Sequence, residues 1–536
     1  MSEWWRGAVI YQIYPRSFQD TDGDGVGDLP GITRRLDHVA RLGADAVWLS
    51  PVFPSPMEDM GYDVSDYCGI DPIFGSLDDF DAMLERAHGL GLKVMLDQVL
   101  SHSSSAHVWF RESRSSRDDP KADWYVWANG LPDGTPPTNW LSLFGGPAWE
   151  WDTQRRQYYL HHFLRSQPDL NYHNPEVQDA MLDSMRFWLE RGVDGFRLDT
   201  ANFYFHDEKL RDDPADPALL GVDWAKPYDA QYHFFSKTRP ENIQFLERMR
   251  ALMDEYGDRA LLGEIVEGKR STSIMADYTR GDGRLHMAYS FEMLGPAFSA
   301  AHIRSRVAGF FDEAPDGWPV WAFSNHDVTR HASRWSHQGD VARLAATLLL
   351  TLPGSVCLYQ GEELGQTQTD LEFHELTDPE GRQFWPVMKG RDGCRTPMVW
   401  DGSASHGGFT EGEPWLPVKP PQAARSVASQ EGEPGSVLEH YRAMLALRRS
   451  RPELRHGGIH FLEAPEPVLA FVRRKGEEAT LCIFNMSAEA RPVQVIGAVD
   501  LAEPAGAVLE GDELHLEPNG FALMRPTQRD VRVVAD

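Results

Sequence analysis

The chain has 536 residues, with 41% hydrophobic and 25% charged residues and a formal net charge of −29. This composition is typical of a soluble globular protein, and the length predicts one large domain with additions or several smaller units. The negative charge argues against nucleic acid and anionic membrane surfaces as partners, because their phosphates would be repelled. Uncharged or cationic small molecules remain.

The cysteines and the N-terminus bear on the compartment. Cys68, Cys357, Cys394 and Cys482 are widely spaced, which favours neither a zinc site nor a disulfide framework and indicates a reducing compartment. The first residues lead into an apolar, strand-like run without a basic segment and apolar core, so we expect no signal peptide. No apolar run reaches the length of about eighteen residues that a membrane span needs. We therefore expect a cytoplasmic protein.

An acidic, glycine-rich segment follows the first predicted strand. Carboxylates of Asp20, Asp22, Asp24 and Asp28, with the carbonyl of Val26, have the alternating spacing of a calcium loop. Four crowded carboxylates would repel one another without a cation, so we expect a structural Ca²⁺ or Mg²⁺ and no organic cofactor. The alternative is an acidic turn that caps the next helix.

Strand-like and helix-like segments then alternate along most of the chain. Helical spacing of apolar residues is found at 29–42, 77–90, 175–191, 241–255, 296–314 and 341–352. Eight short buried strands are predicted at 8–14, 46–49, 93–97, 195–199, 261–264, 286–289, 319–323 and 356–359. Regular alternation predicts parallel βα units and an α/β fold, a (β/α)₈ barrel of about 250 residues before insertions.

Irregular segments interrupt this pattern and define the predicted domains. Residues 1–101 and 175–454 form the barrel, and residues 102–174, rich in Trp, Pro, Gly and Asp, form an inserted subdomain after the third strand. A second long loop, 203–240, leaves the fourth strand and is expected near the mouth of the barrel. Residues 455–536 read as a small all-β domain, predicted as a β-sandwich.

Carboxylates gather at the predicted carboxyl ends of the strands, where barrel enzymes carry their chemistry. Asp97, Asp199, Glu264 and Asp327 all lie at or just past such ends. Arg197 and Asp199 project from the same face of their strand, and the guanidinium favours an ionised carboxylate suited to a nucleophile. The alternative at this point is a buried structural ion pair.

Five motifs in series resemble those of glycoside hydrolase family 13, the α-amylase family. They are Asp97–His102 (with Ser101 where many members have Asn), Gly195–Asp199, Gly263–Glu264, Phe323–Asp327 and, at the end of the insertion, Gln167–Asn171. The resemblance implies a retaining, double-displacement glycosidase, in which two carboxyl groups lie about 5–5.5 Å apart. It makes Asp199 the nucleophile, Glu264 the acid and base, Asp327 the third carboxylate, and His102 and His326 ligands of the sugar ring.

Smaller matches point to a subgroup. Gly61–Tyr67 and Arg391–Met398 are similar to segments of oligo-1,6-glucosidases and α-glucosidases. There Tyr62 would stack on the terminal glucose, and Asp63 would hold its outer hydroxyls and pair with an arginine, preferably Arg395, with Arg391 as the alternative. Phe144, Phe163 and Gln167 would wall the other side, although these aromatics could equally form subdomain core. Thr200, directly after the nucleophile, is similar to the residue of members that prefer α-1,4 bonds.

The resemblance therefore implies an exo-acting α-glucosidase that releases α-glucose from short α-1,4-linked substrates such as maltose, with transglucosylation as a side reaction. The alternatives are a sucrose hydrolase or isomerase and an oligo-1,6-glucosidase of the same family. Its partner would be a small oligosaccharide, with no nucleic acid or membrane, and the protein would be a monomer or small homo-oligomer. A non-catalytic, transporter-associated relative would need a membrane segment and could lack the three carboxylates, all of which this sequence contains.

Overall fold

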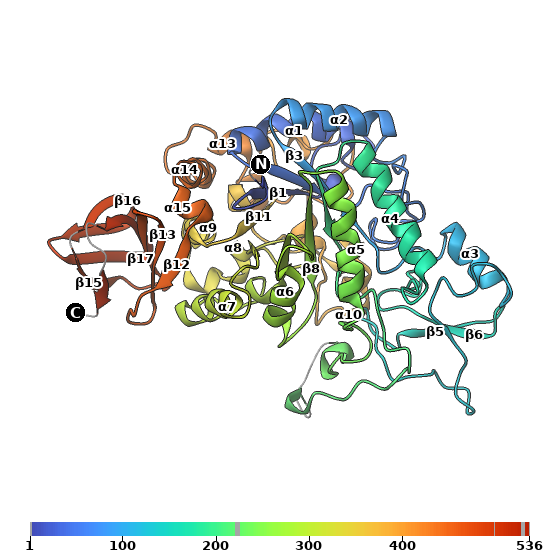
Figure 1. The fold of residues 1–536 in the computed structure, drawn as a ribbon. Coiled ribbons are helices and arrows are strands. Elements are labelled where there is room, and N and C mark those ends of the chain that lie inside the picture. The colour runs from blue at the N-terminus through green and yellow to red at the C-terminus, as the bar shows by residue number, and fades with distance from the viewer. Residues whose placement is uncertain (1–2, 220–225, 498, 527–530, 535–536) are drawn as a thin grey trace.

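The computed structural model describes the chain except for residues 1–2, 220–225, 498, 527–530 and 535–536. Its centre is a sheet of eight parallel strands in the order β10-β11-β1-β2-β3-β7-β8-β9. A parallel bridge between Ala288 and Pro319 joins the two edges, so the sheet closes into the predicted barrel. Figure 1 shows the barrel in the middle of the molecule. The strands are β1 Val9–Ile13, β2 Ala46–Leu49, β3 Lys93–Gln98, β7 Gly195–Leu198, β8 Ala260–Ile265, β9 Met287–Ser290, β10 Val320–Ala322 and β11 Ser355–Tyr359.

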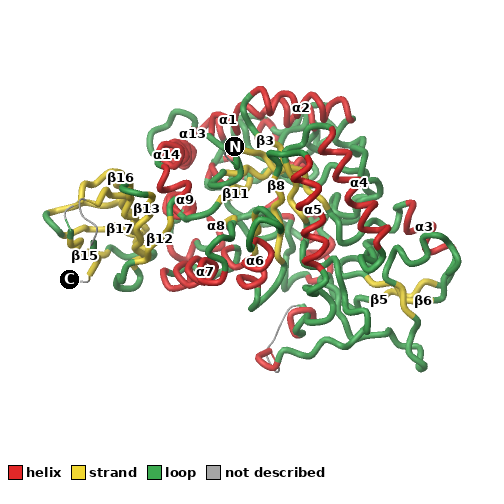
Figure 2. The backbone as a smooth tube through the Cα atoms, viewed as in Figure 1, coloured by secondary structure: helices red, strands yellow, loops and turns green. Residues whose placement is uncertain are grey.

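Helices surround these strands, which Figure 2 separates by colour. Sequence signals fix where several of them begin. Asp28 caps α1 by accepting the Gly31 N–H, Ser76 and Asp79 form a capping box on α2, and Asn174 caps α4. The outer helices are α1 Leu29–Leu42, α2 Leu77–Gly89, α4 Pro175–Glu190, α5 Asn242–Glu255, α6 Ser271–Thr279, α7 Ala300–Glu313, α9 Ala342–Thr351 and α14 Val437–Ser450.

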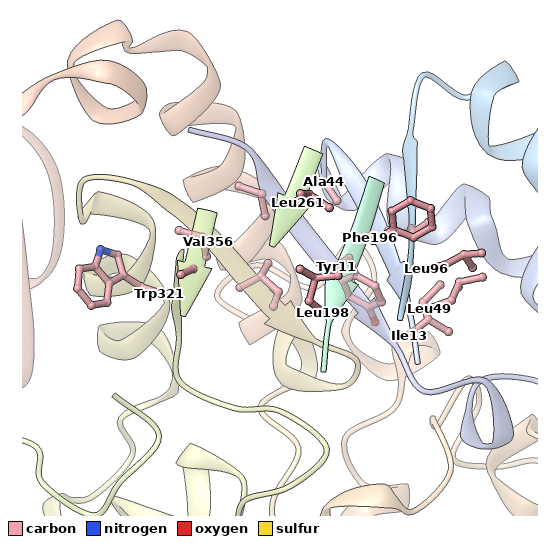
Figure 3. Close-up of a cluster of buried hydrophobic side chains, with 14 of the residues drawn as sticks. Tyr11, Ile13, Ala44, Leu49, Leu96, Phe196, Leu198, Leu261, Trp321 and Val356 are labelled. Atoms are coloured by element: carbon pink, nitrogen blue, oxygen red, sulfur yellow. The ribbon is translucent and has the colours of Figure 1, made fainter. Parts of the chain in front are cut away.

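Alternate side chains of each strand enter two separate cores. Tyr11, Leu49, Leu96 and Leu261 point outward and pack against the helices, as Figure 3 shows. The residues between them point into the barrel, among them Ile10, Trp48, Met95 and Leu262. This two-residue period carries Asp97 and Glu264, two positions beyond Met95 and Leu262, to the inner face. The fold thus aims the strand-end carboxylates at the barrel axis.

The inserted segment and the second long loop pack against each other beside the barrel mouth. The insertion contains α3 Val108–Ser115 and a small antiparallel sheet, β4 Trp127–Ala128, β6 Gln157–Leu160 and β5 Trp149–Asp152. The loop carries the 3₁₀ turns η2 Pro217–Leu219 and η3 Pro227–Ala230, and part of it, 220–225, lies outside the described residues. The Trp140 indole donates to the Arg211 carbonyl over 2.9 Å, which ties the loop to the insertion.

The segment between β11 and α14 is long and mostly irregular. It contains the short helices α10 Pro379–Phe384, α11 Asp392–Arg395, α12 Pro420–Ala423 and α13 Val427–Gln430. Between β10 and α9 lies one more short helix, α8 His331–Arg334. None of the helices among the described residues is long and apolar enough to span a bilayer.

The C-terminal part is all β, as expected, and follows α15 Pro452–His456. Its strands are β12 Gly458–Phe461, β13 Val468–Lys475, β14 Glu478–Asn485, β15 Arg491–Ile496, β16 Val499–Glu510, β17 Glu513–Pro526 and β18 Arg532–Val534. The sandwich arrangement of this domain stays a prediction. All seven strands are joined by hydrogen bonds in one antiparallel sheet. The 14-residue β17 explains this, since it pairs with β14, β15 and β16.

Candidate active site

Arg197 is the hub of the strand-end carboxylates. Its guanidinium lies 2.8 Å from Asp97, 2.7 Å from Asp199 and 2.5 Å from Glu264. Arg197 and Asp97 are fully buried and lie side by side in register on β7 and β3. An isolated charge at this depth would be strongly destabilising, and the shared guanidinium offsets that cost. The prediction that Arg197 and Asp199 share a face is confirmed, and Glu264 joins them.

The turn after β7 sets the direction of Asp199. Gly195 lies so near β8 that a Cβ there would be 2.4 Å from the Ala260 carbonyl oxygen, so only glycine fits. Thr200 has a φ of +40°, a left-handed conformation that is rare for a β-branched residue. Its N–H donates to Glu264 Oε2 over 3.1 Å. Such strain is typical of functional sites, and the hydrogen bond ties the turn after β7 to Glu264 on β8.

Burial and neighbouring carboxylates control the protonation of Asp199 and Glu264. Burial raises the pKa of Asp199 to about 7; Arg197 opposes this, and Asp97 and Asp327 add to it. Burial likewise raises the pKa of Glu264 to about 7, opposed by Arg197 and reinforced by Asp199. Burial therefore favours a proton on this pair of neighbouring carboxyl groups, whereas Arg197 favours its charged form. One carboxylate and one carboxylic acid side by side can supply a nucleophile and an acid.

Asp327 has the opposite electrostatic setting. Burial alone would raise its pKa, but His326, Arg395 and Arg391 lower the pKa of Asp327 to about 2. Its Oδ1 lies 3.0 Å from Arg395 Nη2 and 3.5 Å from Arg391 Nη1. Asp327 is therefore a permanent carboxylate at neutral pH, able to accept hydrogen bonds but not to donate a proton.

A hydrogen-bonded chain fixes His326 and Tyr62. Their rings stack in parallel at 5.3 Å, and His326 Nε2 lies 2.6 Å from the Tyr62 hydroxyl. The Gln12 amide donates to His326 Nδ1 over 2.8 Å, which places the proton of neutral His326 on Nε2. The Tyr62 hydroxyl in turn donates to Asp97 over 3.0 Å. Burial lowers the pKa of His326 well below its ordinary value, so the ring stays neutral.

These groups surround a cavity of about 320 Å³. Of the predicted site residues it collects the three carboxylates, Tyr62, His102, Phe144, Phe163, Thr200 and His326. Arg197, Gln167 and Arg395 are fully buried and are not among its lining residues. Gln167 instead donates to Asp59 over 3.1 Å, and Arg395 donates to the His326 carbonyl over 2.7 Å.

The predicted pairing of Asp63 with Arg395 is wrong. Asp63 is fully buried, burial raises its pKa to about 6, and it accepts hydrogen bonds from Ser55 and from the backbone of Glu58 and Asp59. The pair in the cavity is Asp59 with Arg391, at 2.7 Å. Asp63 therefore supports the turn that presents Asp59.

Sequence reasoning missed several lining residues. Lys226, on the loop after β7, and Glu380, on α10, both line the cavity and form an ion pair with each other. Neither lies in a recognisable motif, and each comes from an irregular segment. The remaining lining residues that had not been predicted are Asp59, Leu143, Val266, Phe291, Val328 and Arg391, the last considered only as an alternative.

Three of the five predicted metal ligands lie close together in the structure. Oxygens of Asp20, Asp22 and Asp28 all lie within 4.8 Å of one another. Asp24 is not in this group, and its carboxylate accepts the N–H of Val26 over 2.7 Å instead. Asp28 also caps α1, which was the alternative for this segment. Burial raises the pKa of Asp28, as expected for a buried carboxylate in an acidic cluster.

Comparison with known proteins agrees with this site. The model of the α-amylase catalytic domain matches residues 12–457. The chain therefore belongs to the α-amylase family, glycoside hydrolase family 13, and is a glycoside hydrolase of the retaining type.

Comparison with individual proteins narrows the part of the family that this chain resembles. The chain is 57% identical to a probable α-glucosidase of Rhizobium meliloti (strain 1021), over 91% of this chain and 90% of the relative. It is 38% identical to an oligo-1,6-glucosidase of Heyndrickxia coagulans, over 91% and 93% of the two chains. Among solved structures, the α-glucosyl transfer enzyme XgtA superposes with a TM-score of 0.95 at 53% identity, covering 98% of this chain and all of that one. The trehalulose synthase MutB of Pseudomonas mesoacidophila MX-45 gives 0.87 at 32%, with the same coverage.

Proposed function

We propose that the protein is an exo-acting α-glucosidase that removes α-glucose from the non-reducing end of short α-1,4-linked substrates such as maltose. The observation that carries this proposal is the shape of the catalytic cavity. The Asp59–Arg391 pair lines it and does not border the second cavity of about 750 Å³, with which the catalytic cavity shares four residues, Leu143, Lys226, Val266 and Phe291. We take this pair to close the end away from the second cavity. A pocket closed behind one sugar and open on the other side fits cleavage from a chain end.

Each carboxyl group has a role in this proposal. Asp199 attacks the anomeric carbon while Glu264 protonates the departing oxygen, which gives a β-glucosyl-enzyme. Glu264, now ionised, takes a proton from water, and the water displaces Asp199 to release α-glucose. Asp327, His102 and His326 hold the ring hydroxyls, and Asp59 with Arg391 hold the outer hydroxyls.

Buried neighbours supply the electrostatics. The Arg197 guanidinium stabilises the anionic form of Asp199 before attack and of Glu264 after it has given up its proton. The Tyr289 hydroxyl, 2.7 Å from Glu264, donates to the same carboxylate oxygen. Both contacts are made before substrate arrives, so little reorganisation is needed during the reaction.

Transfer to a second sugar is the alternative outcome of the same intermediate. The names of two solved relatives, an α-glucosyl transfer enzyme and a trehalulose synthase, favour keeping it as a candidate. The larger second cavity beside the catalytic one would give an acceptor room to bind.

A substrate panel tests these functions together. Maltose, isomaltose, sucrose, trehalose, maltotriose and maltotetraose are each incubated with the enzyme, and products and their initial anomeric form are followed by NMR. We expect α-glucose from maltose and falling kcat/KM with chain length, because the loop 203–240 borders the exit. Initial release of β-glucose would overturn the retaining mechanism. A preference for sucrose would instead favour a sucrose hydrolase or isomerase, and a preference for isomaltose would favour an oligo-1,6-glucosidase.

We also propose that Asp20, Asp22 and Asp28 hold a structural divalent cation, Ca²⁺ or Mg²⁺. Three carboxylates within reach of one ion suit a hard cation with oxygen ligands. Asp20 is held ready for this, because hydrogen bonds from Thr410, Gly23 and Gly25 outweigh burial and lower its pKa. Thermal unfolding of chelator-treated protein with and without each cation is the measurement. A melting temperature that neither cation raises would refute the site.

A further inference from the structure

Lys226 and Glu380 stand where the two cavities meet. Lys226 precedes η3 and lines both cavities, whereas Glu380 lies in the first turn of the short helix α10 and lines the catalytic one. Their charged groups are in direct contact although they come from unrelated irregular segments. Glu380 is 7% exposed, so the pair is a largely desolvated contact at the exit of the catalytic cavity.

The other charged residues that line the second, outer cavity balance in number, with Lys237, Lys269 and Arg270 against Asp216, Asp229 and Glu267. Lys269 lies 3.0 Å from Asp216, and Arg270 lies 3.0 Å from Glu267. Lys237 is buried and donates to the Val266 carbonyl over 2.7 Å. Cations and anions in such balance leave no strong field for a charged ligand, so the cavity suits an uncharged group.

Glu380 is also linked to the closed end of the catalytic cavity. Asp378, the N-cap of α10, accepts the Glu380 N–H and binds the Arg391 guanidinium at 2.7 Å. Arg391 in turn holds Asp59. The N-terminus of one short helix therefore connects Glu380 with the Asp59–Arg391 pair.

We propose that Lys226 and Glu380 bind the hydroxyl groups of the uncharged sugar on the leaving side of the scissile bond, and so select a sugar over other leaving groups. A carboxylate accepts from sugar hydroxyls and an ammonium donates to them, and each group positions the other. This inference rests on the proposed α-glucosidase function.

The test compares two substrates that differ only in the leaving group, maltose and 4-nitrophenyl α-glucoside. In Lys226→Met and Glu380→Gln we expect kcat/KM for maltose to fall at least about 10-fold, which is within the range of one lost hydroxyl contact. The aryl glucoside, which has no sugar there, should change less than about 3-fold. In the double variant the two losses should be less than multiplicative, because each residue positions the other.

A matched ion pair supplies the control. Lys419 and Glu375 lie 2.7 Å apart in the same irregular segment and belong to neither cavity. Lys419→Met should leave kcat/KM unchanged for both substrates. Equal losses on maltose and the aryl glucoside, or no loss on maltose, would overturn the proposal. Unfolding temperatures are measured for all variants, and if Glu380→Gln fails to fold, Lys226→Met alone decides.

Failure of the proposed function is distinguishable from failure of this inference. If the unaltered enzyme does not split maltose, the α-1,4 assignment fails, and the same comparison is made with whichever disaccharide of the panel it splits. A selective loss on that disaccharide supports the pair as a leaving-group site. A uniform loss refutes it.

Discussion

Arg391 donates to Asp59 over 2.7 Å, and Asp63 holds Asp59 from behind by accepting its backbone N–H over 3.1 Å. The two acidic residues are four positions apart and buried, yet only Asp59 faces the cavity. They should therefore respond differently to the same chemical change.

We expect Asp59→Asn to lower kcat/KM by about 100-fold, because it weakens the proposed contact of this carboxylate with the hydroxyls of the substrate. The melting temperature should change little, because Arg391 keeps its ion pair with Asp378. Asp63→Asn should lower the free energy of unfolding by about 1–3 kcal/mol, because three hydrogen bonds converge on its carboxylate. Steady-state kinetics and calorimetry on both variants are the measurements. Equal kinetic losses at equal stability would contradict the division of roles.

Asp199 and Glu264 can be separated by leaving-group ability. Asp199→Asn keeps the shape and removes the nucleophile, so kcat should fall by about 10⁴-fold or more on every glucoside. In Glu264→Gln, kcat should fall by about 10²–10⁴-fold on maltose, because the leaving oxygen of maltose needs a proton. On an aryl glucoside with a good leaving group the loss in the glucosylation step should be much smaller. Pre-steady-state kinetics would detect it, and near-normal turnover of maltose by either variant would refute the assignment.

The pH dependence of activity should follow the protonation of this pair. The active form carries one proton, so kcat/KM should fall at low pH, when both groups are protonated, and at high pH, when Glu264 loses its proton. The Tyr289 hydrogen bond favours the ionised form of Glu264 and thus lowers its pKa. Removing it in Tyr289→Phe should move the alkaline limb upward by about one pH unit.

Tyr278→Phe is the control for this shift, because Tyr278 is a buried tyrosine whose hydroxyl meets Asn242 rather than a catalytic carboxyl. Its profile should match that of the unaltered enzyme. An alkaline limb that stays in place in Tyr289→Phe, or moves to lower pH, would show that Tyr289 does not govern the acid.

The barrel and the strand-end carboxylates could be predicted because both follow from local patterns. A two-residue period places Asp97 and Glu264 inside, and the Gly195–Asp199 motif contains both Arg197 and the carboxylate that it binds. The Asp59–Arg391 contact joins residues 332 positions apart, and no local pattern reports such a pairing. The turn around Asp59 also contains Met57 and Met60 with φ of +63° and +52°. A methionine in the sequence gives no reason to expect this left-handed conformation. Tertiary packing, not a local sequence pattern, therefore determines where Asp59 and Arg391 lie in the site.

The hydrogen bonds of Thr200 restrict how this residue can influence linkage preference. It lines the cavity, but its hydroxyl also lies 3.0 Å from the Ser101 hydroxyl and 3.3 Å from Asp199. Ser101 in turn lies 2.9 Å from Nδ1 of His102, a proposed sugar ligand. The Thr200 hydroxyl can therefore influence the leaving sugar directly or through the orientation of His102.

We expect the unaltered enzyme to prefer maltose over isomaltose, and Thr200→Val to shift the ratio of kcat/KM toward isomaltose by about 10-fold or more, the effect of one lost polar contact. Valine keeps the β-branched shape at φ of +40°, so the turn should persist. Ser101→Ala separates the two routes, because it breaks the link to His102 and leaves the Thr200 hydroxyl in the cavity. The same shift in both variants would assign the effect to His102, and a shift in Thr200→Val alone would assign it to direct contact. An unchanged ratio in Thr200→Val would leave Thr200 a packing residue, and preference of the unaltered enzyme for isomaltose would overturn the α-1,4 assignment.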